Sequence, residues 1–318
     1  MDKGKLIETL KKSRPNAKDS TINMYASNLM KLMKTMESED FKFLKTPNKV
    51  EEILKDLHYT TRRNYLNAVV VYLMAEEEKN EELIEKYTEL RDELNKKYEE
   101  DQATGVISDK QKDNFVDIEE VNKMIESMRK EIVDRNIFTK TTLTPRERSL
   151  LQVYVIYSIY SRVPLRNDVA GMEVITKTVY NKLTDEDKKE RNYLVMTKNS
   201  MFMVLNRFKT QKKYGELVFY LQKDLEKILR KYIKINGKGV LFKSGTGKPL
   251  SRNALSQLML KTSKKYMNKN ISSTMLRKIY LSSKYADVKE EMIKDSVVMG
   301  HSTEMQSKVY IKKPQEEK

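Results

Sequence analysis

The sequence contains no cysteine, which excludes disulfides, thiolate metal sites and cysteine nucleophiles. It contains only two histidines, His58 and His301, and their separation along the chain does not favour a histidine metal site. No apolar run approaches the roughly 20 residues that span a bilayer, and the first residues lack the apolar core of a signal peptide. We therefore expect an intracellular, soluble protein that holds no metal.

Glycine and proline are also scarce, at 9 and 6 of 318 residues, whereas leucine, lysine, glutamate, methionine and isoleucine are plentiful. This composition favours helices. The hydrophobic fraction of 39% is sufficient for a folded core, and the length fits one large domain or two ordinary ones.

The charge is unevenly distributed. The formal net charge is +16, but residues 76–101 hold 12 acidic and 5 basic side chains and carry −7, so the remainder carries +23. Such an excess favours a polyanionic partner, with nucleic acid as the first candidate. A lysine-rich protein without such a partner is the alternative that charge alone leaves open.

The pattern of apolar residues predicts two domains. Residues 1–101 read as a small helical domain, residues 102–116 as a polar linker, and residues 117–318 as a larger domain. Within the larger domain, helices are expected over residues 117–136, 144–163, 221–235, 251–267 and 273–288. The segments NYLVMTKN, SMFMVLNRFKT and GELVFYL are short and rich in β-branched and aromatic residues, and they predict three antiparallel strands. The expected fold is mainly α with a small antiparallel β-sheet.

Several cations stand where they could meet an anion. Arg62 and Arg63 fall in the first turn of a predicted helix, exposed, where cations oppose the helix dipole. Arg166 follows a buried helix and a proline turn, so it needs an anion nearby. That anion is either a ligand or the carboxylate of Asp168 or Glu173.

The stretch NRFKTQKKYGELVF predicts a β-hairpin with lysines at its tip. Lys209 falls at the end of the first strand, Lys212 and Lys213 fall in the turn, and Gly215 can supply a positive φ. A lysine-tipped hairpin can enter a groove of DNA, although lysine-decorated turns are also common on ordinary surfaces.

The string SGTGK resembles a phosphate-binding loop but lacks its pattern. Phe242 stands where the first glycine is required, and Pro249 replaces the Ser or Thr that follows the lysine. Nucleotide binding is therefore not expected. Arg252, in the first turn of the helix predicted to follow, could still contact a backbone phosphate.

Two further motifs lie near the C-terminus. Thr274 and Arg277 share one face of a predicted amphipathic helix. Thr303 and Gln306 fit a capping box, so a helix is expected to begin near Glu304 and to leave His301 outside it. His301 and Tyr310 could then converge.

The order of these residues resembles the tyrosine recombinase (phage integrase) family. The order is an arginine, a lysine in a hairpin, x-x-x-Arg on a helix, Gly-His, and a tyrosine nine residues later. The resemblance covers about residues 117–312, and STINMYASNLMKLM in the N-terminal domain is similar to the family's helical core-binding domain. The amino-acid sequence of the hairpin and arginine segments is similar to that of integrase-like proteins of large DNA viruses and their satellites.

The resemblance implies a role for each residue. Tyr310 would attack the scissile phosphate and form a 3′-phosphotyrosyl link, Arg166 and Arg277 would grip the phosphate oxygens, Lys209 would protonate the leaving 5′ oxygen, and His301 would hydrogen-bond the phosphate. The family further implies a double-stranded DNA partner, a homotetramer on DNA, and no metal or other cofactor. Its members work at DNA, in a prokaryotic cytoplasm or, for a viral protein, in a nucleus or viral factory.

This sequence departs from the family pattern at Thr274 and after Tyr310, and two other interpretations of its function stay open. Thr274 occupies the place where the family usually has histidine, and threonine can donate a hydrogen bond but cannot carry charge. Only eight residues follow Tyr310, although family members often pass a C-terminal helix to a neighbour. A type IB topoisomerase uses nearly the same residues, and a DNA-binding relative that has lost catalysis would also fit.

Overall fold

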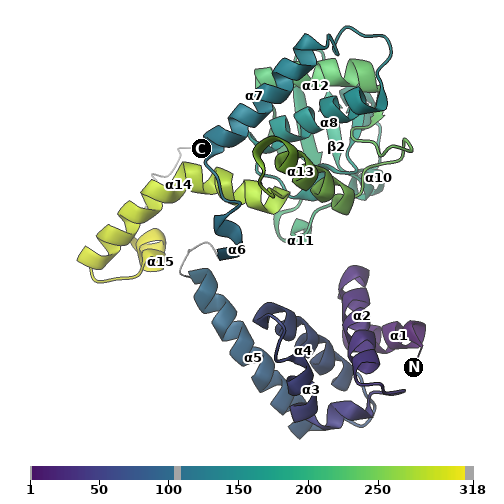
Figure 1. Ribbon diagram of the computed structural model, residues 1–318, viewed down its shortest axis with the longest axis vertical. Helices are drawn as coiled ribbons and strands as arrows, with labels where there is room; N and C mark the ends of the chain where they lie inside the picture. The colour runs from purple at the N-terminus through teal and green to yellow at the C-terminus, as the bar shows by residue number, and fades with distance from the viewer. Residues whose placement is uncertain (1, 104–108, 312–318) are drawn as a thin grey trace. The chain divides into compact units, whose positions relative to one another are not determined.

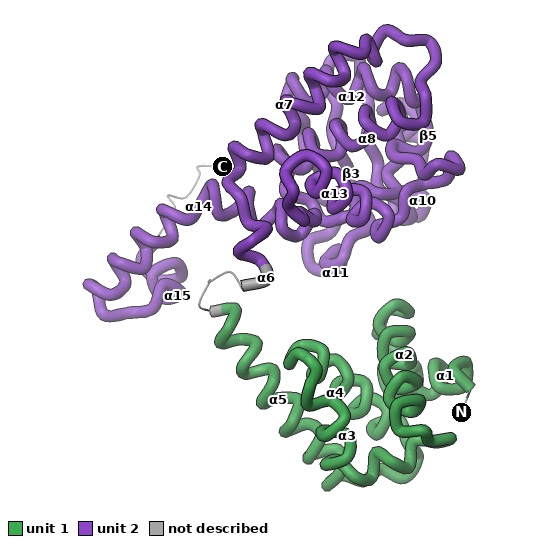
Figure 2. Tube along the Cα trace, viewed as in Figure 1, with its two compact units in different colours: residues 1–107 green, residues 108–318 purple. Residues whose placement is uncertain are grey.

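The computed structural model describes residues 2–103 and 109–311 and divides the chain into two compact units (Figures 1 and 2). The first unit comprises residues 1–107 and the second comprises residues 108–318. Residues 104–108, which form part of the linker expected at 102–116, lie outside the described residues.

The first unit is entirely helical in its described part. Its elements are α1 (Lys3–Ser13), α2 (Asp19–Thr35), the 3₁₀ helix η1 (Lys42–Lys45), α3 (Pro47–Leu54), α4 (Tyr59–Leu73) and α5 (Glu81–Ala103). Helix α4 lies at the centre and packs against α1, α2 and α5. The acidic helix α5 turns Leu83, Leu90 and Leu94 toward this core, and its buried Tyr87 donates a 2.9 Å hydrogen bond from its hydroxyl to the Leu44 carbonyl.

The second unit combines helices with one sheet. Its helices are α6 (Asp109–Lys112), α7 (Ile118–Asp134), α8 (Pro145–Tyr160), the 3₁₀ helix η2 (Asn167–Val169), α9 (Lys177–Tyr180), α10 (Asp185–Glu190), α11 (Gln211–Tyr214), α12 (Lys223–Asn236), α13 (Arg252–Met267), α14 (Ser273–Val298), α15 (Thr303–Met305) and the π-helix η3 (Gln306–Tyr310). Helices α7, α8, α12 and α13 cover the stretches predicted to be helical, and the mainly α prediction is confirmed.

The sheet has five strands in the order β4-β3-β2-β1-β5. The strands are β1 (Glu173–Thr176), β2 (Tyr193–Met196), β3 (Met201–Leu205), β4 (Leu217–Tyr220) and β5 (Gly239–Val240). The three predicted strands pair antiparallel as expected. The prediction did not include β1 and β5, and the parallel pairing of β1 with β2 makes the sheet mixed. The two residues of β5 are too few to show an alternating pattern, whereas β1 is as long as β2 and β4 and was not predicted.

Helix α8 is the core of the second unit. Nearly all of its residues from Leu150 to Tyr160 are buried, and it packs against α7, α12, α13 and α14. The buried Tyr157 hydroxyl donates a 2.8 Å hydrogen bond to the Met259 carbonyl and so joins α8 to α13. The chain that leaves α8 at Tyr160 reaches Arg166 just before η2, so the packing of α8 fixes where the segment with this arginine begins.

Helix α14 extends beyond the body of the second unit, with α15 folded beside its outer end (Figure 1). It runs unbroken to Val298, ten residues beyond the predicted end at residue 288. Residues 281–291 are all exposed, and the sequence from 286 to 298 contains no glycine or proline that would stop the helix.

Within the described ranges, 2–103 and 109–311, no helix combines the length and apolarity needed to cross a membrane.

The start of α8 generates a testable prediction about stability. Thr144 caps the helix in a capping box with Glu147, whose carboxylate also pairs with Lys140. The hydrogen bonds from Lys140 and Thr144 lower the pKa of Glu147 from its ordinary 4.5 to about 2. A carboxylate whose pKa is lower in the folded state stabilises the fold above pH 4.5, and this contribution is lost as the pH falls toward 2.

We expect Glu147→Gln to lower the free energy of unfolding at pH 7 and to flatten its pH dependence between pH 4.5 and 2. Urea denaturation across this pH range measures both effects. Glu186→Gln, at an exposed position in the first turn of α10, is the control and should leave the curve unchanged. Curves for Glu147→Gln and wild type that stay parallel below pH 4.5 would contradict the prediction.

Candidate functional site

Arg166 and Arg277 come from segments more than a hundred residues apart, and the positive charge of Arg166 acts on the Arg277 guanidinium. Arg166 precedes η2, immediately beyond the end of α8, and Arg277 lies in the second turn of α14. Burial, and after it the neighbouring positive charge of Arg166, lower the pKa of the Arg277 guanidinium. Two cations repel at this range, so their pairing is costly unless an anion sits between them.

Asp168 supplies part of the compensating negative charge. Its side chain is 7% exposed and accepts a 2.7 Å hydrogen bond from Arg252, whose side chain is 59% exposed. Asp168 and Tyr160 both oppose the fall in the pKa of Arg277, which places both of them near the arginine pair.

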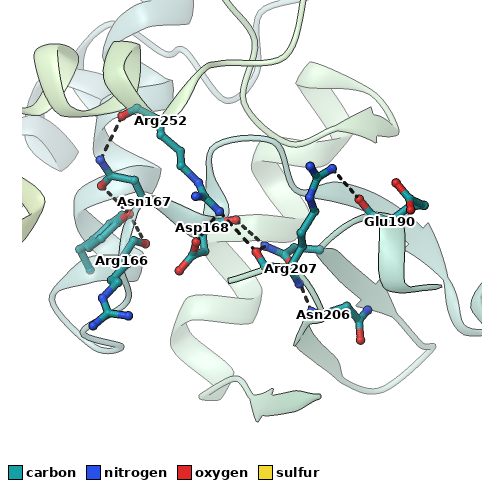
Figure 3. A network of polar contacts seen from close by, with 9 residues as sticks. Arg166, Asn167, Asp168, Glu190, Asn206, Arg207 and Arg252 are labelled. Carbon is teal, nitrogen blue, oxygen red and sulfur yellow. Dashed lines mark hydrogen bonds and ion pairs between the residues drawn. The ribbon is translucent and has the colours of Figure 1, made fainter. Parts of the chain in front are cut away.

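The sequence left open whether Arg166 meets a ligand or the carboxylate of Asp168 or Glu173, and the structure shows that both carboxylates pair with other arginines. Asp168 pairs with Arg252, and Glu173 pairs with Arg191. Arg166 is exposed, and Figure 3 shows its guanidinium turned away from the Asp168–Arg252 pair. In the described part of the chain, the side-chain Nε of Arg277 also lacks a hydrogen-bond partner although it is buried. Both arginines can therefore accept an external anion.

Hydrogen bonds to the backbone fix the segment that carries Arg166. The Tyr160 hydroxyl donates to the Arg166 carbonyl at 2.8 Å, and burial raises the pKa of this tyrosine. The Asn167 amide donates to the Arg252 carbonyl at 3.0 Å and to Ser256 Oγ at 2.7 Å. The end of α8 and the start of α13 are thus held together (Figure 3).

A buried asparagine, Asn192, joins this segment to the one that carries Lys209. Its Nδ2 donates to the carbonyls of Asp168 and Arg207, at 2.8 and 3.1 Å. Its Oδ1 accepts from the backbone N–H groups of Asn206 and Arg207, at 2.9 and 2.7 Å. The sequence did not indicate this role, because an asparagine before a strand is usually an ordinary turn residue.

Lys209 lies in a turn four residues beyond the end of β3, so its predicted place at the strand end was wrong. Residues 206–216 form the connection between β3 and β4, and the short helix α11 replaces a tight hairpin turn. Lys209, Lys212 and Lys213 are all exposed, and Gly215 has the positive φ, 67°, that was anticipated. The chain needs this longer connection because Asn192 binds the backbone of residues 206 and 207.

A cavity of about 580 Å³ opens beside the network. Three arginines, Arg191, Arg207 and Arg252, line it together with three acidic residues, Asp168, Glu173 and Glu190. Arg207 also donates to the Glu190 carbonyl at 3.3 Å (Figure 3). The region around Arg166 is therefore rich in guanidinium groups, which suit phosphate oxygens because they offer paired N–H donors.

His301 and Tyr310 converge as a second pair. Their rings stack with centroids 4.8 Å apart and planes within 13° of parallel. Gly300, with a φ of 68°, turns the chain after α14. The helix that follows begins at Thr303 and is capped by Ser302 rather than Thr303, so His301 lies outside it as expected. Tyr310 is 55% exposed, and the buried Nε2 of His301 has no hydrogen-bond partner among the described residues.

The structure keeps the two pairs apart. Thr274 is exposed one turn before Arg277 at the start of α14, whereas His301 and Tyr310 lie beyond its far end. At 1.5 Å per residue, the helix from Arg277 to Val298 is about 32 Å long. Four of the six candidate catalytic residues therefore belong to the body of the unit. The other two belong to the arm (residues 281–311), which consists of the outer part of α14, α15 and η3.

Arg62 and Arg63 were expected to be exposed, and this was wrong. Both are half-buried because α5 packs beside α4, and the Arg63 guanidinium lies 4.1 Å from the centroid of the Tyr98 ring. In the described ranges no group of three or more His, Asp or Glu side chains is arranged to hold a metal ion.

No family model and no curated protein matches the chain. Among solved structures, the chain is similar to the XerH site-specific recombinase bound to difH substrate in a pre-cleavage complex, with 14% identity, 98% of this chain and 85% of that chain covered, and a TM-score of 0.49. A post-cleavage XerH complex with palindromic difH gives 15% identity, 96% and 79% coverage and a TM-score of 0.46. The XerA recombinase gives 11% identity, 97% and 92% coverage and a TM-score of 0.36. Similarity this low assigns no residue roles.

The buried carboxylate of Asp168 generates a prediction. We expect Asp168→Asn to destabilise the second unit by about 1–3 kcal/mol, because Arg252 and Arg277 would lose the negative charge between them. Urea denaturation followed by circular dichroism measures the change. Asp185→Asn, at a side chain 81% exposed, is the matched control and should change stability by less than about 0.5 kcal/mol. Equal effects of the two substitutions would show that Asp168 does not stabilise the arginine pair.

Proposed function

We propose that this chain is a site-specific DNA recombinase or integrase that breaks and rejoins DNA through a 3′-phosphotyrosyl intermediate. The observation that carries the proposal is the Arg166–Arg277 pair, in which the charge of Arg166 acts on Arg277 and the buried Nε of Arg277 has no hydrogen-bond partner among the described residues, beside the buried Asp168. Repulsion between them favours a bound anion, and a phosphodiester in DNA is the anion that the net charge of +16 would attract.

Each candidate residue has a role that follows from its chemistry. The Tyr310 hydroxyl loses its proton to solvent as its oxygen attacks phosphorus, a bond forms between oxygen and phosphorus, and the bond from phosphorus to the 5′ oxygen breaks. Lys209 gives a proton to that leaving oxygen. Arg166 and Arg277 stabilise the extra negative charge of the transition state, and His301 donates a hydrogen bond to the same phosphate. Thr274 can donate one more hydrogen bond, but it carries no charge.

The phosphotyrosyl ester conserves the energy of the broken bond. A free 5′ hydroxyl can therefore attack it and reverse the steps, with either the original strand or a new one as product. The reaction as proposed requires no ATP and no metal, since the arginines supply the positive charge that a metal would otherwise supply.

Double-stranded DNA is the proposed partner. Lys212, Lys213 and Arg252 are exposed on the second unit, and we assign them contacts to backbone phosphates. Arg62 and Arg63 of the first unit are proposed to contact DNA as well, with Arg63 held in place by Tyr98. Exchange of strands between two sites requires several copies, and we propose a tetramer on DNA.

The arm must move for this chemistry. Tyr310 reaches the arginine pair either when α14 bends or when a second copy supplies its own Tyr310. Bending costs mainly helical hydrogen bonds, because residues 281–291 are all exposed and none of their side chains is buried. We therefore propose that α14 bends within one chain when DNA binds.

Covalent trapping tests the reaction. Wild type, mixed with nicked DNA carrying candidate sites and without metal, should form a protein–DNA adduct that survives a denaturing gel. We expect Tyr310→Phe to form none, because phenylalanine has no nucleophile. Tyr285→Phe, at another exposed tyrosine of the arm, is the control and should trap DNA as wild type does.

The alternative outcomes point to other proteins. An adduct that survives Tyr310→Phe would place the nucleophile elsewhere. DNA binding without any adduct, across a broad set of sites, would indicate a relative that has lost catalysis. Relaxation of supercoiled DNA that lacks a partner site would favour a type IB topoisomerase.

Mixing two inactive variants tests the movement of the arm. Arg277→Ala lacks part of the arginine pair, and Tyr310→Phe lacks the nucleophile. If α14 bends within one chain, each protomer has one of the two defects, so the mixture should form less than about 1% of the wild-type adduct, given the cost of roughly 10²–10³ when one such stabilising group is lost. Quantitative gel analysis of equimolar mixtures measures this. An adduct restored to a quarter or more of the wild-type amount would show that a second copy supplies the tyrosine.

A further inference from the structure

A second cavity, of about 750 Å³, lies on a different part of the second unit. Its walls come from the first half of α8, the end of α12, residues 243–250 and α13. Arg148, in one wall, precedes Tyr160 by twelve residues of α8, or about 18 Å along the helix. The cavity shares Leu250 with the cavity of about 580 Å³, but neither Arg166 nor Asp168 lines it, and its volume is within the range of small-molecule sites.

The floor of this cavity is apolar. Leu143, Leu151 and Leu250 line it and are buried, and Ile235 and Leu258 line it and are half-buried. A floor of this kind suits an apolar ligand body, because burying apolar surface is favourable.

One wall is held rigid by hydrogen bonds. Gln152 Oε1 accepts from the Lys243 backbone N–H at 2.9 Å and from the Tyr232 hydroxyl at 3.2 Å. Its Nε2 donates to the Lys243 carbonyl at 3.1 Å. These three bonds fix residue 243 against α8 and α12, so the cavity is formed before any ligand enters.

The rim carries positive charge without a carboxylate. Arg148, Lys243 and Lys261 line the cavity, and none of the residues that line it is acidic. Lys243 Nζ donates to the Asn236 carbonyl at 2.8 Å and Arg148 Nε donates to the Leu143 carbonyl at 3.3 Å. None of the three cations forms an ion pair within the described ranges. Cations without a counter-charge beside an apolar floor select a ligand that has both an anionic and an apolar part.

We propose that this cavity binds a small organic anion, an apolar body of the size of a fused aromatic pair or a medium-length alkyl chain that bears one acidic group. The acidic group meets Arg148, Lys243 and Lys261, and the body lies on the leucine floor. The SGTGK string, which does not form a nucleotide-binding loop, contributes Ser244, Gly245 and Gly247 to the rim.

The probe for the first experiment is 8-anilinonaphthalene-1-sulfonate, whose fluorescence rises in an apolar site. Wild type should show one saturable site for it. N-phenyl-1-naphthylamine has the same body without the sulfonate, and it should bind more weakly. Decanoate should displace the sulfonate probe, and decanol at the same concentration should not.

Two variants place the probe in the cavity. Arg148→Gln combined with Lys261→Gln should weaken binding of the sulfonate at least about tenfold, because two charge-assisted contacts are lost. The binding of N-phenyl-1-naphthylamine should stay the same. Ala254→Phe, which fills the cavity from α13, should abolish the site for both probes. Lys227→Gln combined with Lys231→Gln removes two exposed charges from α12 outside the cavity and is the matched control.

Exposed apolar residues on the arm can also bind such dyes, but that binding is the same in all variants and is subtracted. Circular dichroism establishes that each variant is folded. Sulfonate binding that is equal in wild type, the double glutamine variant and Ala254→Phe would overturn the proposal. Equal affinity for the charged and the neutral probe in wild type would overturn it too.

Discussion

The buried side chain of Asn192 holds together the parts of the proposed site that lie in the body of the second unit. Its side-chain amide forms hydrogen bonds with the backbone of two segments. One contains Asp168, after α8, and the other contains residues 206 and 207, after β3. A buried amide left without partners is costly, so these four hydrogen bonds are either all made or the local fold is lost. The position of Lys209 relative to Arg166 depends on this constraint.

In the arginine pair, the like charges that favour binding of an anion also lower the stability of the fold. The two like charges of Arg166 and Arg277 destabilise the fold, and Asp168, Tyr160 and the backbone bonds around Asn167 compensate for them. A site that is strained without its ligand gains the most when a phosphate binds, because binding removes the repulsion. The same site would bind a neutral ligand poorly.

The arm presents a different physical situation. Residues 281–291 of helix α14 are all exposed, and large apolar side chains such as Tyr285, Val288 and Ile293 are among those exposed along it. A helix of this kind is held by its own hydrogen bonds alone, so its shape can change at low cost. The stacked His301–Tyr310 pair is therefore preorganised as a local unit, while its distance from the arginines is left adjustable.

The sequence by itself determined the features that depend on local chemistry. Apolar periodicity predicted α7, α8, α12 and α13, β-branched and aromatic segments predicted β2 to β4, and a glycine before His301 allowed the turn that brings it to Tyr310. These features depend on neighbours within about ten residues, and sequence patterns report such neighbours directly.

Only the tertiary structure decided the rest. The parallel pairing of β1, the partner of Asp168, the role of Asn192 and the half-buried state of Arg62 and Arg63 all depend on groups far away in the chain. The separation of the two residue pairs was not predicted either. The sequence does contain the signals for a long α14, with no glycine or proline from 286 to 298 and Gly300 just after the helix, but where its outer end lies relative to the arginines depends on how the helix leaves the body of the unit (Figure 1).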